Sequence, residues 1–494
     1  MGKKYFLSID RGQSAIKAAF LDFHADICFI ESVDCQPIQS PHPGWAQQDM
    51  NFIWDQTVAI IRSLLENSGV RPEEIAAVSF SGQGGGNFLI SEDGKAVYPG
   101  VLSMDRRHEE VYSGNVSPIE VPRTIAFMLW LKEHHPDVYK NTRWILGSKD
   151  WIRYCLTGNA NADMSDTPAP VNYVTGEYSK ECAQLAGIPE CVEKLPPLKY
   201  ASQICGSVTR KAAEETGLLA GTPVVMGAHD MIACSAGCGG HRQGHLTIIM
   251  GTMGINIAVF DNNVELLECN PGECFEFGGI SKGVKTVTTS IGSGCNTVNW
   301  MLDLFFEKEK EEARQKNQSI FTLLEEKLLG KEPTDIIFQP YLLGTFYNSN
   351  AKAGILGMSD QTKKEDILLA LFQGVCLSMC LEIEKLENKA QIRFDDIWLT
   401  GGGSKSSIWG QMYADVLRRP VKIGQTGEAG CRGAAICAGI ALGLFDLDKK
   451  FPAPRVDKIY YPRKEASEKY EKQLQIYKEA YQSSVDLWDQ QKTL

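Results

Sequence analysis

The chain has 494 residues, with 50 Lys and Arg against 61 Asp and Glu and a formal net charge of -11. This acidic balance disfavours nucleic acid and anionic membranes as partners, because both select for clusters of Lys and Arg. A hydrophobic content of 43% is ordinary for a globular protein, and the length exceeds what one core supports. Two domains of similar size are therefore expected.

The amino terminus and the cysteines indicate a reducing compartment. No apolar stretch long enough for a signal peptide precedes Asp10, and we find no run long enough to span a bilayer. None of the 15 cysteines forms a Cys-x-x-Cys pair, which disfavours structural zinc and iron-sulfur clusters. Cys234 and Cys238 have the spacing of buried helical thiols, and any further role for them stays open. A cytoplasmic location fits these observations.

The first predicted elements form a hairpin. Tyr5 to Ile9 is predicted to be a strand, Asp10-Arg-Gly-Gln-Ser14 a polar turn and Ala15 to Leu21 a second strand. Such a turn exposes backbone N–H groups and a hydroxyl to an anion, while Asp10 can hold a cation beside it. The motif alone is weak, because hairpin turns of this composition are also common for conformational reasons.

Two polar turns follow in the first half of the chain. Ile75 to Phe80 is a predicted strand that leads into Ser81-Gly-Gln-Gly-Gly-Gly86, where glycines let a small ligand approach the backbone and Gln83 can donate and accept hydrogen bonds. Further on, Asp105-Arg106-Arg107 can present a carboxylate and a guanidinium to a polyol. A surface salt bridge explains this second pattern equally well.

One carboxylate stands where α/β proteins place their chemistry. Val224 and Val225 run into Gly227, and Asp230 follows at the end of this run, before a small-residue segment that reads as a helix start. Open sheets hold their reacting groups just outside the carboxyl ends of strands, so Asp230 is the candidate central residue. The alternative for the isolated pattern is a turn former or a helix cap.

The hairpin pattern returns in the second half. His245 to Met250 and Ile255 to Phe260 are predicted strands around the tight turn Gly251-Thr-Met-Gly254. Two copies about half the chain apart suggest a duplicated domain, and two such turns could grip the phosphates of a nucleotide. A chance similarity between two hairpins is the alternative.

A glycine-rich turn near the carboxyl terminus indicates a nucleotide. Ile397 to Thr400 is a predicted buried strand, and Gly401-Gly-Gly-Ser-Lys-Ser406 opens the next helix. Bare glycines let an adenine or ribose lie against the backbone, and the helix dipole favours a nearby anion. The segment does not have the Walker A spacing.

These ordered motifs resemble the FGGY carbohydrate kinases of the actin-like, ribonuclease-H-like ATPase superfamily, over nearly the whole chain. The matching segments are Ile9-Asp10-Arg-Gly-Gln-Ser14, Pro43-Gly-Trp-Ala-Gln-Gln-Asp49, Ser81-Gly-Gln-Gly84, Gly227-Ala-His-Asp230, Gly251-Thr252 and Gly401-Gly-Gly-Ser-Lys-Ser-Ser-Ile-Trp409. Within the family, the pattern is closest to the L-xylulokinase type. Many D-xylulokinases carry Met-His where this chain has Gly84-Gly85, and Phe127 replaces a usual Lys. Both departures concern the sugar side.

The resemblance implies an α/β fold of two ribonuclease-H-like domains with a central cleft. The predicted segments are 1–244 for the sugar and phosphate side, 245–450 for the nucleotide side and 451–494 for a C-terminal segment with a packing helix. It also implies a small-molecule sugar substrate, ATP and Mg2+ as cofactors, no nucleic-acid or membrane partner, and allows a homodimer.

The resemblance further implies the role of each site residue. Asp230 would take the proton from the attacking hydroxyl, and Asp10 would hold Mg2+, usually through water. The polyol would contact Gln83, Gly84, Asp105, Arg106 and Asp230. The phosphates would be surrounded by Gly12, Gln13, Ser14, Gly251 and Thr252, and the adenosine would lie near Asn296, Gly402, Gly403 and Ser406.

The expected reaction is ATP-dependent phosphorylation of a ketose, with L-xylulose or a related pentulose as the substrate. Gly84 and Gly85 remove a hydrogen-bonding side chain and are expected to open room near one end of the polyol. That room, with Arg106 nearby, makes 3-keto-L-gulonate the runner-up; D-xylulose, ribulose and glycerol are further alternatives. An inactive sugar-binding regulator should have lost Asp230 or Asp10, and both are present. An activator of an iron-sulfur enzyme needs cysteines at cluster spacing, which this sequence does not have.

Overall fold

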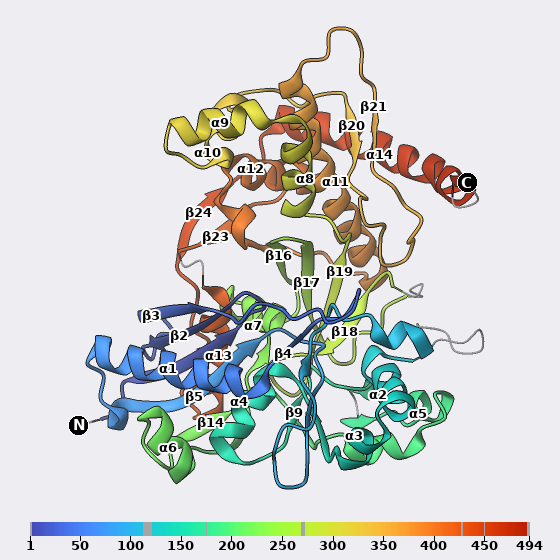
Figure 1. The fold of residues 1–494 in the computed structure, drawn as a ribbon. Coiled ribbons are helices and arrows are strands. Elements are labelled where there is room, and N and C mark those ends of the chain that lie inside the picture. Colours follow the sequence, from blue (N-terminus) through green and yellow to red (C-terminus); the bar gives the residue numbers. More distant parts are fainter. Residues whose placement is uncertain are drawn as a thin grey trace. The chain divides into compact units, whose positions relative to one another are not determined.

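The computed structural model describes residues 2–111, 121–173, 175–267, 272–425, 428–448 and 450–491 (Figure 1). The chain forms two compact units, each built on a seven-stranded mixed sheet with helices packed on it. Unit 1 contains Met1–His241, Phe277–Thr286 and Glu428–Ala453, and unit 2 contains Arg242–Glu276, Val287–Gly427 and Pro454–Leu494. The predicted α/β class and the predicted division into two domains are confirmed.

The sheet of unit 1 has the order β13-β14-β5-β1-β2-β3, with β15 also paired to β5. Its strands are β1 (Tyr5–Arg11), β2 (Ala15–Leu21), β3 (Ile27–Asp34), β5 (Ile75–Gly82), β13 (Ile204–Ser207), β14 (Pro223–Val225) and β15 (Ala228–His229). Strand β1 is antiparallel to β2 and parallel to β5, and β5 is parallel to β14. Because every residue of β5 is buried, this strand forms the centre of the unit.

Two pairs of helices pack on this sheet. Helix α1 (Met50–Ser68) contacts α4 (Ser148–Thr157), and α7 (Asp230–Gly237) contacts α13 (Ala429–Ala441). Helix α1 begins where the Asp49 carboxylate accepts from the N–H groups of Asn51 and Phe52, and it ends at Gly69 with a φ of 67°. The remaining helices of the unit are α2 (Arg123–His134), α3 (Pro136–Asn141), α5 (Glu181–Leu185) and α6 (Arg210–Thr216).

The sheet of unit 2 repeats the topology of unit 1. Its order is β18-β19-β17-β16-β22-β23-β24, in which β16 is antiparallel to β17, parallel to β22, and β22 is parallel to β23. The strands are β16 (His245–Met250), β17 (Gly254–Asp261), β18 (Phe275–Gly278), β19 (Val284–Ser290), β22 (Asp396–Thr400), β23 (Val421–Gly424) and β24 (Val456–Tyr460). Since β16 and β17 take the places of β1 and β2, the duplication predicted from the two hairpins is confirmed.

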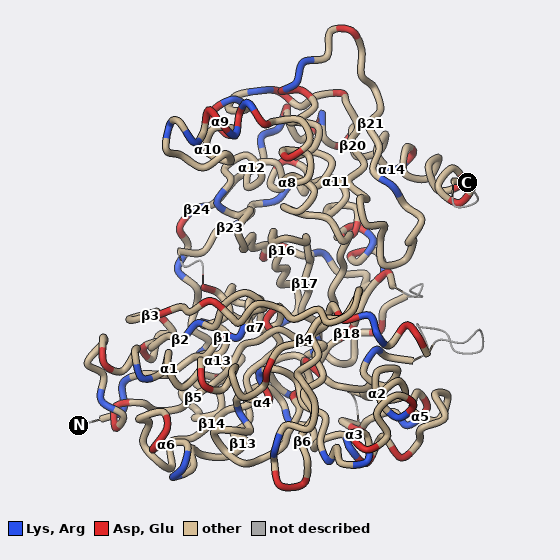
Figure 2. Tube along the Cα trace, in the orientation of Figure 1, with Lys and Arg blue, Asp and Glu red and all other residues tan. Residues whose placement is uncertain are grey.

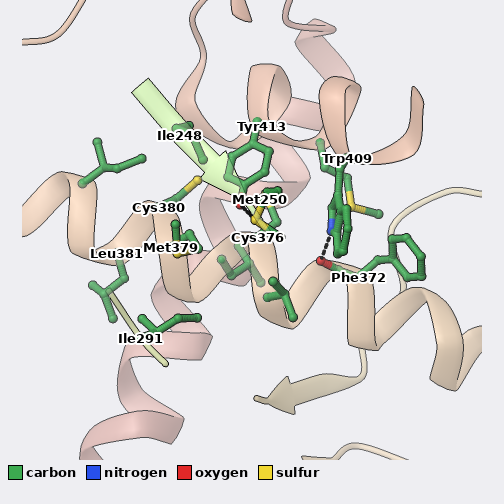
Figure 3. Packing of buried hydrophobic residues seen from close by; sticks show 14 of the residues in the cluster. Ile248, Met250, Ile291, Phe372, Cys376, Met379, Cys380, Leu381, Trp409 and Tyr413 are labelled. Atoms are coloured by element: carbon green, nitrogen blue, oxygen red, sulfur yellow. Dashed lines mark hydrogen bonds between the residues drawn. The ribbon is translucent and has the colours of Figure 1, made fainter. Parts of the chain in front are cut away.

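The core of unit 2 is organised around the long helix α11 (Lys364–Ala390). Figure 3 shows Phe372, Cys376 and Met379 of this helix packed with Trp409 and Met250. The other helices are α8 (Cys295–Phe305), α9 (Glu307–Gln315), α10 (Ile320–Leu328), α12 (Ser407–Leu417) and α14 (Lys464–Gln491). Helix α14 is the predicted C-terminal packing helix, which buries Tyr470, Tyr477 and Trp488.

Helix α11 corrects one expectation from the sequence. By length and composition it could cross a membrane, whereas the sequence analysis found no run long enough to do so. However, 89% of its most apolar window is buried inside the protein, which is the position of a core helix. Asp366, whose carboxylate accepts from the Lys363 N–H at 3.0 Å, supports the start of this helix.

The compact units do not follow the predicted segments 1–244, 245–450 and 451–494. Residues 428–453 belong to unit 1 although most of them lie in the predicted second domain, and residues 454–494 belong to unit 2. The physical reason is a close helix contact within unit 1. A Cβ on Gly433 of α13 would lie 1.9 Å from the Ala233 carbonyl oxygen, and one on Gly237 of α7 would lie 2.1 Å from the Ala429 oxygen.

Positively and negatively charged residues are interspersed along both units. Figure 2 shows Lys and Arg interspersed with Asp and Glu on the helices and loops. Many of them form ion pairs on the surface, such as Lys132 with Glu190 and Lys478 with Glu384. The expectation that the protein has no nucleic-acid partner remains a prediction from its net charge.

The contact between α7 and α13 leads to a stability prediction. The substitution Gly433→Ala should lower the free energy of unfolding by about 3 kcal/mol, because the added methyl group meets backbone rather than a movable side chain. Chemical denaturation measures the effect. Gly402→Ala is the control, since a Cβ there has nothing within 4 Å. Equal stability of the two variants would show that the helix contact is not tight.

Candidate functional site

The turn between β1 and β2 is formed by Gly12, Gln13 and Ser14. It is narrow, because the Gly12 N–H donates to the Ala15 carbonyl at 3.0 Å and a Cβ on Gly12 would lie 3.2 Å from the same oxygen. The Ser14 carbonyl accepts from the Cys35 N–H at 2.8 Å, while its side chain is exposed. The predicted anion turn therefore has a fixed backbone and an accessible hydroxyl.

Asp10 lies near the end of β1, opposite Ser81 of β5. Burial, with a smaller contribution from the charge of Asp230, raises the pKa of the Asp10 carboxyl to about 6, although the Ser81 hydroxyl opposes the shift. Its Oδ1 atom is buried and has no hydrogen-bond partner among the described residues. A buried carboxylate oxygen that lacks a donor fits a cation such as Mg2+, which needs few protein ligands when water and phosphate complete its shell.

Asp230 is positioned by a turn that only glycine allows. Gly227 has a φ of 71°, and a Cβ there would lie 2.1 Å from the Phe80 carbonyl oxygen. The chain can therefore pass close to β5, pair through β15 and begin α7 at Asp230. The predicted strand end and helix start are confirmed. The Asp230 side chain is 39% exposed, so it is open to a substrate.

His229 is the immediate neighbour of this carboxylate. Its Nδ1 atom lies 2.9 Å from Asp230 Oδ1 and 3.2 Å from the Met231 nitrogen. Burial lowers the pKa of His229, but the charge of Asp230 and the hydrogen bond with it outweigh burial and raise the pKa above its ordinary value. His229 stands in the matching segment Gly227-Ala-His-Asp230 but was given no role there, because a lone His beside an Asp has no distinctive pattern.

The imidazole also explains Gly84. A Cβ on Gly84 would lie 2.1 Å from His229 Cδ2 and 2.6 Å from Asp166 Oδ1, so a side chain at this position would require the imidazole and the carboxylate to move. From the sequence, the glycine pair is expected to open room for the substrate. At Gly84 that expectation is wrong, because the imidazole and the Asp166 carboxylate already fill the space. Gly85 has a φ of 72° and its N–H donates to Asp166 Oδ1 at 3.1 Å.

Gln83 is held on both sides of its amide. Its Nε2 donates to Ser103 Oγ at 2.9 Å and to Gln13 Oε1 at 3.3 Å, which joins the glycine-rich turn to the phosphate turn. Its Oε1 accepts from Arg11, which also donates to the Gly12 carbonyl at 3.0 Å. Arg11 is fully buried, and burial lowers its pKa. The structure thus joins Gly12 and Gln83 through the Arg11 guanidinium, and Gln13 through the Gln83 amide.

Asp105 and Arg106 differ from the predicted polyol contacts. Asp105 is buried, and its carboxylate accepts from Arg107 Nε at 2.8 Å, from Arg107 Nη2 at 2.7 Å and from the Ala46 N–H at 2.6 Å. Arg106 instead points to the surface, where it pairs with Glu109 at 2.9 Å. These contacts are those of a structural ion pair and a surface salt bridge. A direct role of Asp105 and Arg106 in sugar binding stays a prediction that their geometry does not favour.

A buried charge cluster beside the glycine-rich turn is not apparent from the sequence. Lys149 is fully buried and pairs with Asp150 at 3.0 Å, with Asp166 at 3.2 Å and with Asp163. The three carboxylates outweigh the burial penalty and keep the pKa of Lys149 raised. Helical periodicity could not reveal the cluster, because Lys149 and Asp150 follow each other in α4 while Asp163 and Asp166 lie beyond the end of this helix.

In unit 2, the turn between β16 and β17 packs on the start of α8. The Asn296 N–H donates to the Thr252 carbonyl at 3.0 Å, and the Cys295 N–H donates to the Gly251 carbonyl at 3.0 Å. The Asn296 side chain accepts from the N–H groups of Gly294 and Thr297, at 2.8 and 2.7 Å. The structure therefore brings together three of the predicted nucleotide residues, although the amide of Asn296 is engaged with its own backbone.

The triple-glycine turn lies against the same end of β16. A Cβ on Gly401 would lie 2.7 Å from the Met250 carbonyl oxygen, and one on Gly403 would lie 2.7 Å from Met250 Cβ. Gly402 is exposed and has open space where a side chain would be. Ser406 is the N-cap of α12 and accepts from the Trp409 N–H at 3.4 Å. Gly402 is thus the member of the turn that a flat ligand can reach.

Comparison with known proteins identifies the family. Residues 5–237 match the N-terminal domain of the FGGY family of carbohydrate kinases, and residues 247–442 match its C-terminal domain. The chain belongs to the FGGY family of carbohydrate kinases. It is therefore a sugar kinase of the two-domain, actin-like fold, and the resemblance inferred from its motifs is confirmed.

Several curated FGGY kinases resemble the chain over most of its length. A probable L-xylulose kinase of Haemophilus influenzae is 27% identical, over 96% of this chain and 97% of that protein. The L-xylulose/3-keto-L-gulonate kinase of Escherichia coli is 29% identical, over 90% of this chain and 89% of that protein. A probable L-xylulose kinase of Pasteurella multocida is 30% identical, over 88% of this chain and 90% of that protein.

Solved structures agree with the fold. The xylulose kinase of Rhodospirillum rubrum superposes with a TM-score of 0.85 at 22% identity, covering 98% of this chain and 100% of that one. The gluconate kinase of Lactobacillus acidophilus has the same TM-score at 21% identity and covers 99% of both chains. Because kinases named for different sugars superpose equally well, the fold does not select the sugar. As an FGGY kinase, the protein uses ATP.

The buried state of Asp10 leads to a pH-dependent stability prediction. A carboxyl whose pKa is raised to about 6 on folding stabilises the protein below its unfolded pKa near 4, and this contribution is lost as the pH rises through 6. Asp10→Asn should therefore stabilise the metal-free protein by ~1 to 3 kcal/mol at pH 8 and much less at pH 4.5. Denaturation at both pH values, without nucleotide or Mg2+, measures the difference.

Asp137→Asn serves as the matched control for this experiment, since Asp137 is exposed in α3. Its effect should be small and similar at both pH values. An Asp10→Asn variant whose effect does not change with pH would mean that the Asp10 carboxylate is solvated in the folded protein.

Proposed function

We propose that this FGGY kinase transfers the γ-phosphoryl group of ATP to the terminal hydroxyl of L-xylulose. The observation that carries the proposal is the exposed Asp230 carboxylate at the start of α7, next to His229 and the turn that contains Gln83 and Gly84. The names of the relatives from H. influenzae, E. coli and P. multocida support L-xylulose as the acceptor.

In this proposal Asp230 is the general base. Its carboxylate is accessible, and Oδ1 is oriented by the Met231 N–H at 2.6 Å. That bond leaves Oδ2 to take the proton from the attacking sugar hydroxyl, which becomes a better nucleophile as the proton leaves. Phosphoryl transfer otherwise requires alignment and charge stabilisation, so one well-placed carboxylate is sufficient chemistry for the protein to supply.

The remaining predicted residues divide between phosphate and adenosine. Gly12, Gln13 and Ser14 of unit 1 and Gly251 and Thr252 of unit 2 are proposed to bind phosphate oxygens through backbone N–H groups and hydroxyls. Adenosine contacts are proposed for Asn296, Gly402, Gly403 and Ser406. The packing of Gly403 and the engagement of the Asn296 amide make the backbone, rather than these side chains, the expected contact.

Asp10 is the proposed ligand for Mg2+, usually through water. When bound, Mg2+ neutralises charge on the ATP phosphates. Asp10 fits this role because its Oδ1 is buried and has no hydrogen-bond partner in the described part of the chain. The described residues contain no group of three or more His, Cys, Asp or Glu side chains that could hold a metal, so phosphate and water must supply the other ligands.

L-xylulose is preferred to 3-keto-L-gulonate as the proposed substrate. The Asp166 carboxylate borders Gly84 and lies on the side where a substrate carboxylate was expected to fit, so two like charges would repel. Arg106, the cation expected to bind that carboxylate, pairs with Glu109 at the surface.

Three further parts of the proposal rest on the sequence alone. They are a cytoplasmic location, the lack of a nucleic-acid or membrane partner, and a homodimer.

The proposed base is tested by Asp230→Asn. This variant should bind sugar with little change in Kd, whereas kcat should fall by roughly 10²-fold or more, the range for loss of a positioned general base. Calorimetric sugar binding and a coupled ADP-release assay measure the two quantities. Asp137→Asn is the control and should keep both values. A kcat within a few fold of the wild type would show that Asp230 is not the base.

The proposed substrate is tested by a panel of acceptors. We expect kcat/KM to be highest for L-xylulose and at least about tenfold lower for D-xylulose, L-ribulose, 3-keto-L-gulonate and glycerol, because a misplaced or missing hydroxyl leaves a buried polar group unpaired. The coupled ADP-release assay is run under one set of conditions. If kcat/KM is highest for 3-keto-L-gulonate, the repulsion argued from Asp166 is wrong. If it is highest for glycerol, the substrate is not a ketose.

A further inference from the structure

The imidazole of His229 separates two groups of the candidate site. Its Nδ1 edge lies against Asp230 Oδ1 at 2.9 Å, and its Nε2 edge borders the glycine-rich turn, 2.2 Å from where a Cβ on Gly84 would be. The Nδ1 atom has hydrogen-bond partners. In the described part of the chain, no hydrogen bond to Nε2 is found, and the side chain is 13% exposed. One ring nitrogen is thus engaged with the proposed base and the other is unpaired at the sugar turn.

The position of this ring is fixed from several sides. The His229 N–H donates to Ser165 Oγ at 2.9 Å, and Ser165 is itself held by the buried Asp163. The ring lies 5.8 Å from that of Phe277, centroid to centroid. Because Gly84 has no side chain, the imidazole can lie directly against the turn. A ring held in this way presents Nε2 in one direction rather than sampling several.

The hydrogen on Nε2 follows from the contacts of Nδ1. Where Nδ1 accepts from the Met231 N–H, the neutral ring carries its hydrogen on Nε2. Where Nδ1 donates to Asp230, Nε2 also carries a hydrogen once the ring is protonated, and the charge of Asp230 raises the pKa of His229. The charged groups around the ring are Asp230, Asp166 and Lys149. In the arrangement where the Met231 N–H donates to Nδ1, Nε2 is a donor that needs an oxygen acceptor.

We propose that His229 determines sugar specificity by donating a hydrogen bond from Nε2 to an oxygen of the bound ketose, while its Nδ1 edge positions the carboxylate of Asp230. The inference rests on the proposed function, in which Asp230 receives the proton of the reacting hydroxyl. Because both nitrogens belong to one five-membered ring, the acceptor is a hydroxyl oxygen on a carbon close to the reacting one. A sugar with the opposite configuration there loses this bond.

Two substitutions separate the two edges of the ring. In His229→Asn, the side-chain amide can take the place of Nδ1 but cannot reach as far as Nε2, so the contact to Asp230 is kept and the sugar contact is lost. In His229→Gln, the longer side chain can take the place of Nε2 and keeps the sugar contact. Asn and Gln are both neutral and similar in size, so the two variants differ mainly in whether the amide replaces Nδ1 or Nε2.

The expected results differ for the two variants. His229→Asn should raise the KM and the ATP-free Kd for L-xylulose by about tenfold or more, as expected for an unpaired buried sugar oxygen, with kcat within a few fold of the wild type. His229→Asn should also lower the ratio of kcat/KM for L-xylulose to that for D-xylulose. His229→Gln should keep KM and Kd within about threefold and lower kcat. His24→Asn and His24→Gln are controls on an exposed His of unit 1 and should change none of these values.

The outcomes decide between the inference and the proposed function. Wild-type turnover of L-xylulose tests the proposed function, whereas the contrast between the Asn and Gln variants in sugar Kd, measured without ATP, tests the inference. Equal sugar Kd values in both variants, whether both unchanged or both raised with a lowered Tm, would overturn the specificity role of Nε2. If the wild type prefers another polyol, the same contrast is measured with that polyol and is judged in the same way.

Discussion

The parallel pairing of β5 with β1 on one side and with β14 and β15 on the other is the constraint on which unit 1 depends. It places Asp10 opposite Ser81, and it brings Ala228 opposite Ser81 as well, so that Asp230 follows directly at the same edge of the sheet. Carboxyl ends of parallel strands meet at one edge because their directions agree. Two carboxylates separated by 220 positions in the sequence thereby influence each other's charge state.

Close backbone contacts turn this pairing into a defined site. Gly227 lets the chain after β14 pass against Phe80, and Gly433 lets α13 rest on the backbone of α7. At Gly84 the excluded side chain is replaced by the imidazole of His229, so the missing atoms leave no hole. In all three places a single methyl group would meet atoms closer than van der Waals contact allows, and a buried site cannot relax freely around it.

The charges of unit 1 are arranged at a cost to stability. Burial of Asp10 raises its pKa to about 6, so the ionised form needed to hold a cation is disfavoured in the metal-free protein. Lys149, in contrast, is buried with three carboxylates and so stays protonated beneath the glycine-rich turn. Such a cluster fixes the loop that carries Asp166 and Ser165, because removing Lys149 would take away the cation that all three carboxylates share. Rigidity around His229 and Asp230 follows from this arrangement.

The sequence by itself determined the α/β class, the duplicated hairpins, the family and the strand end that carries Asp230, because these depend on local patterns of polarity and glycine. It predicted Gln83 and the turn at Gly251 correctly as members of strand-end turns, whereas Asp10, predicted to begin the first turn, lies within β1. Only the tertiary structure decided that α13 belongs to unit 1, that Arg107 takes up the carboxylate of Asp105, and that His229 fills the space beside Gly84. These features are contacts between segments far apart in the chain, and a pattern read along one segment carries no information about which distant side chain will meet it.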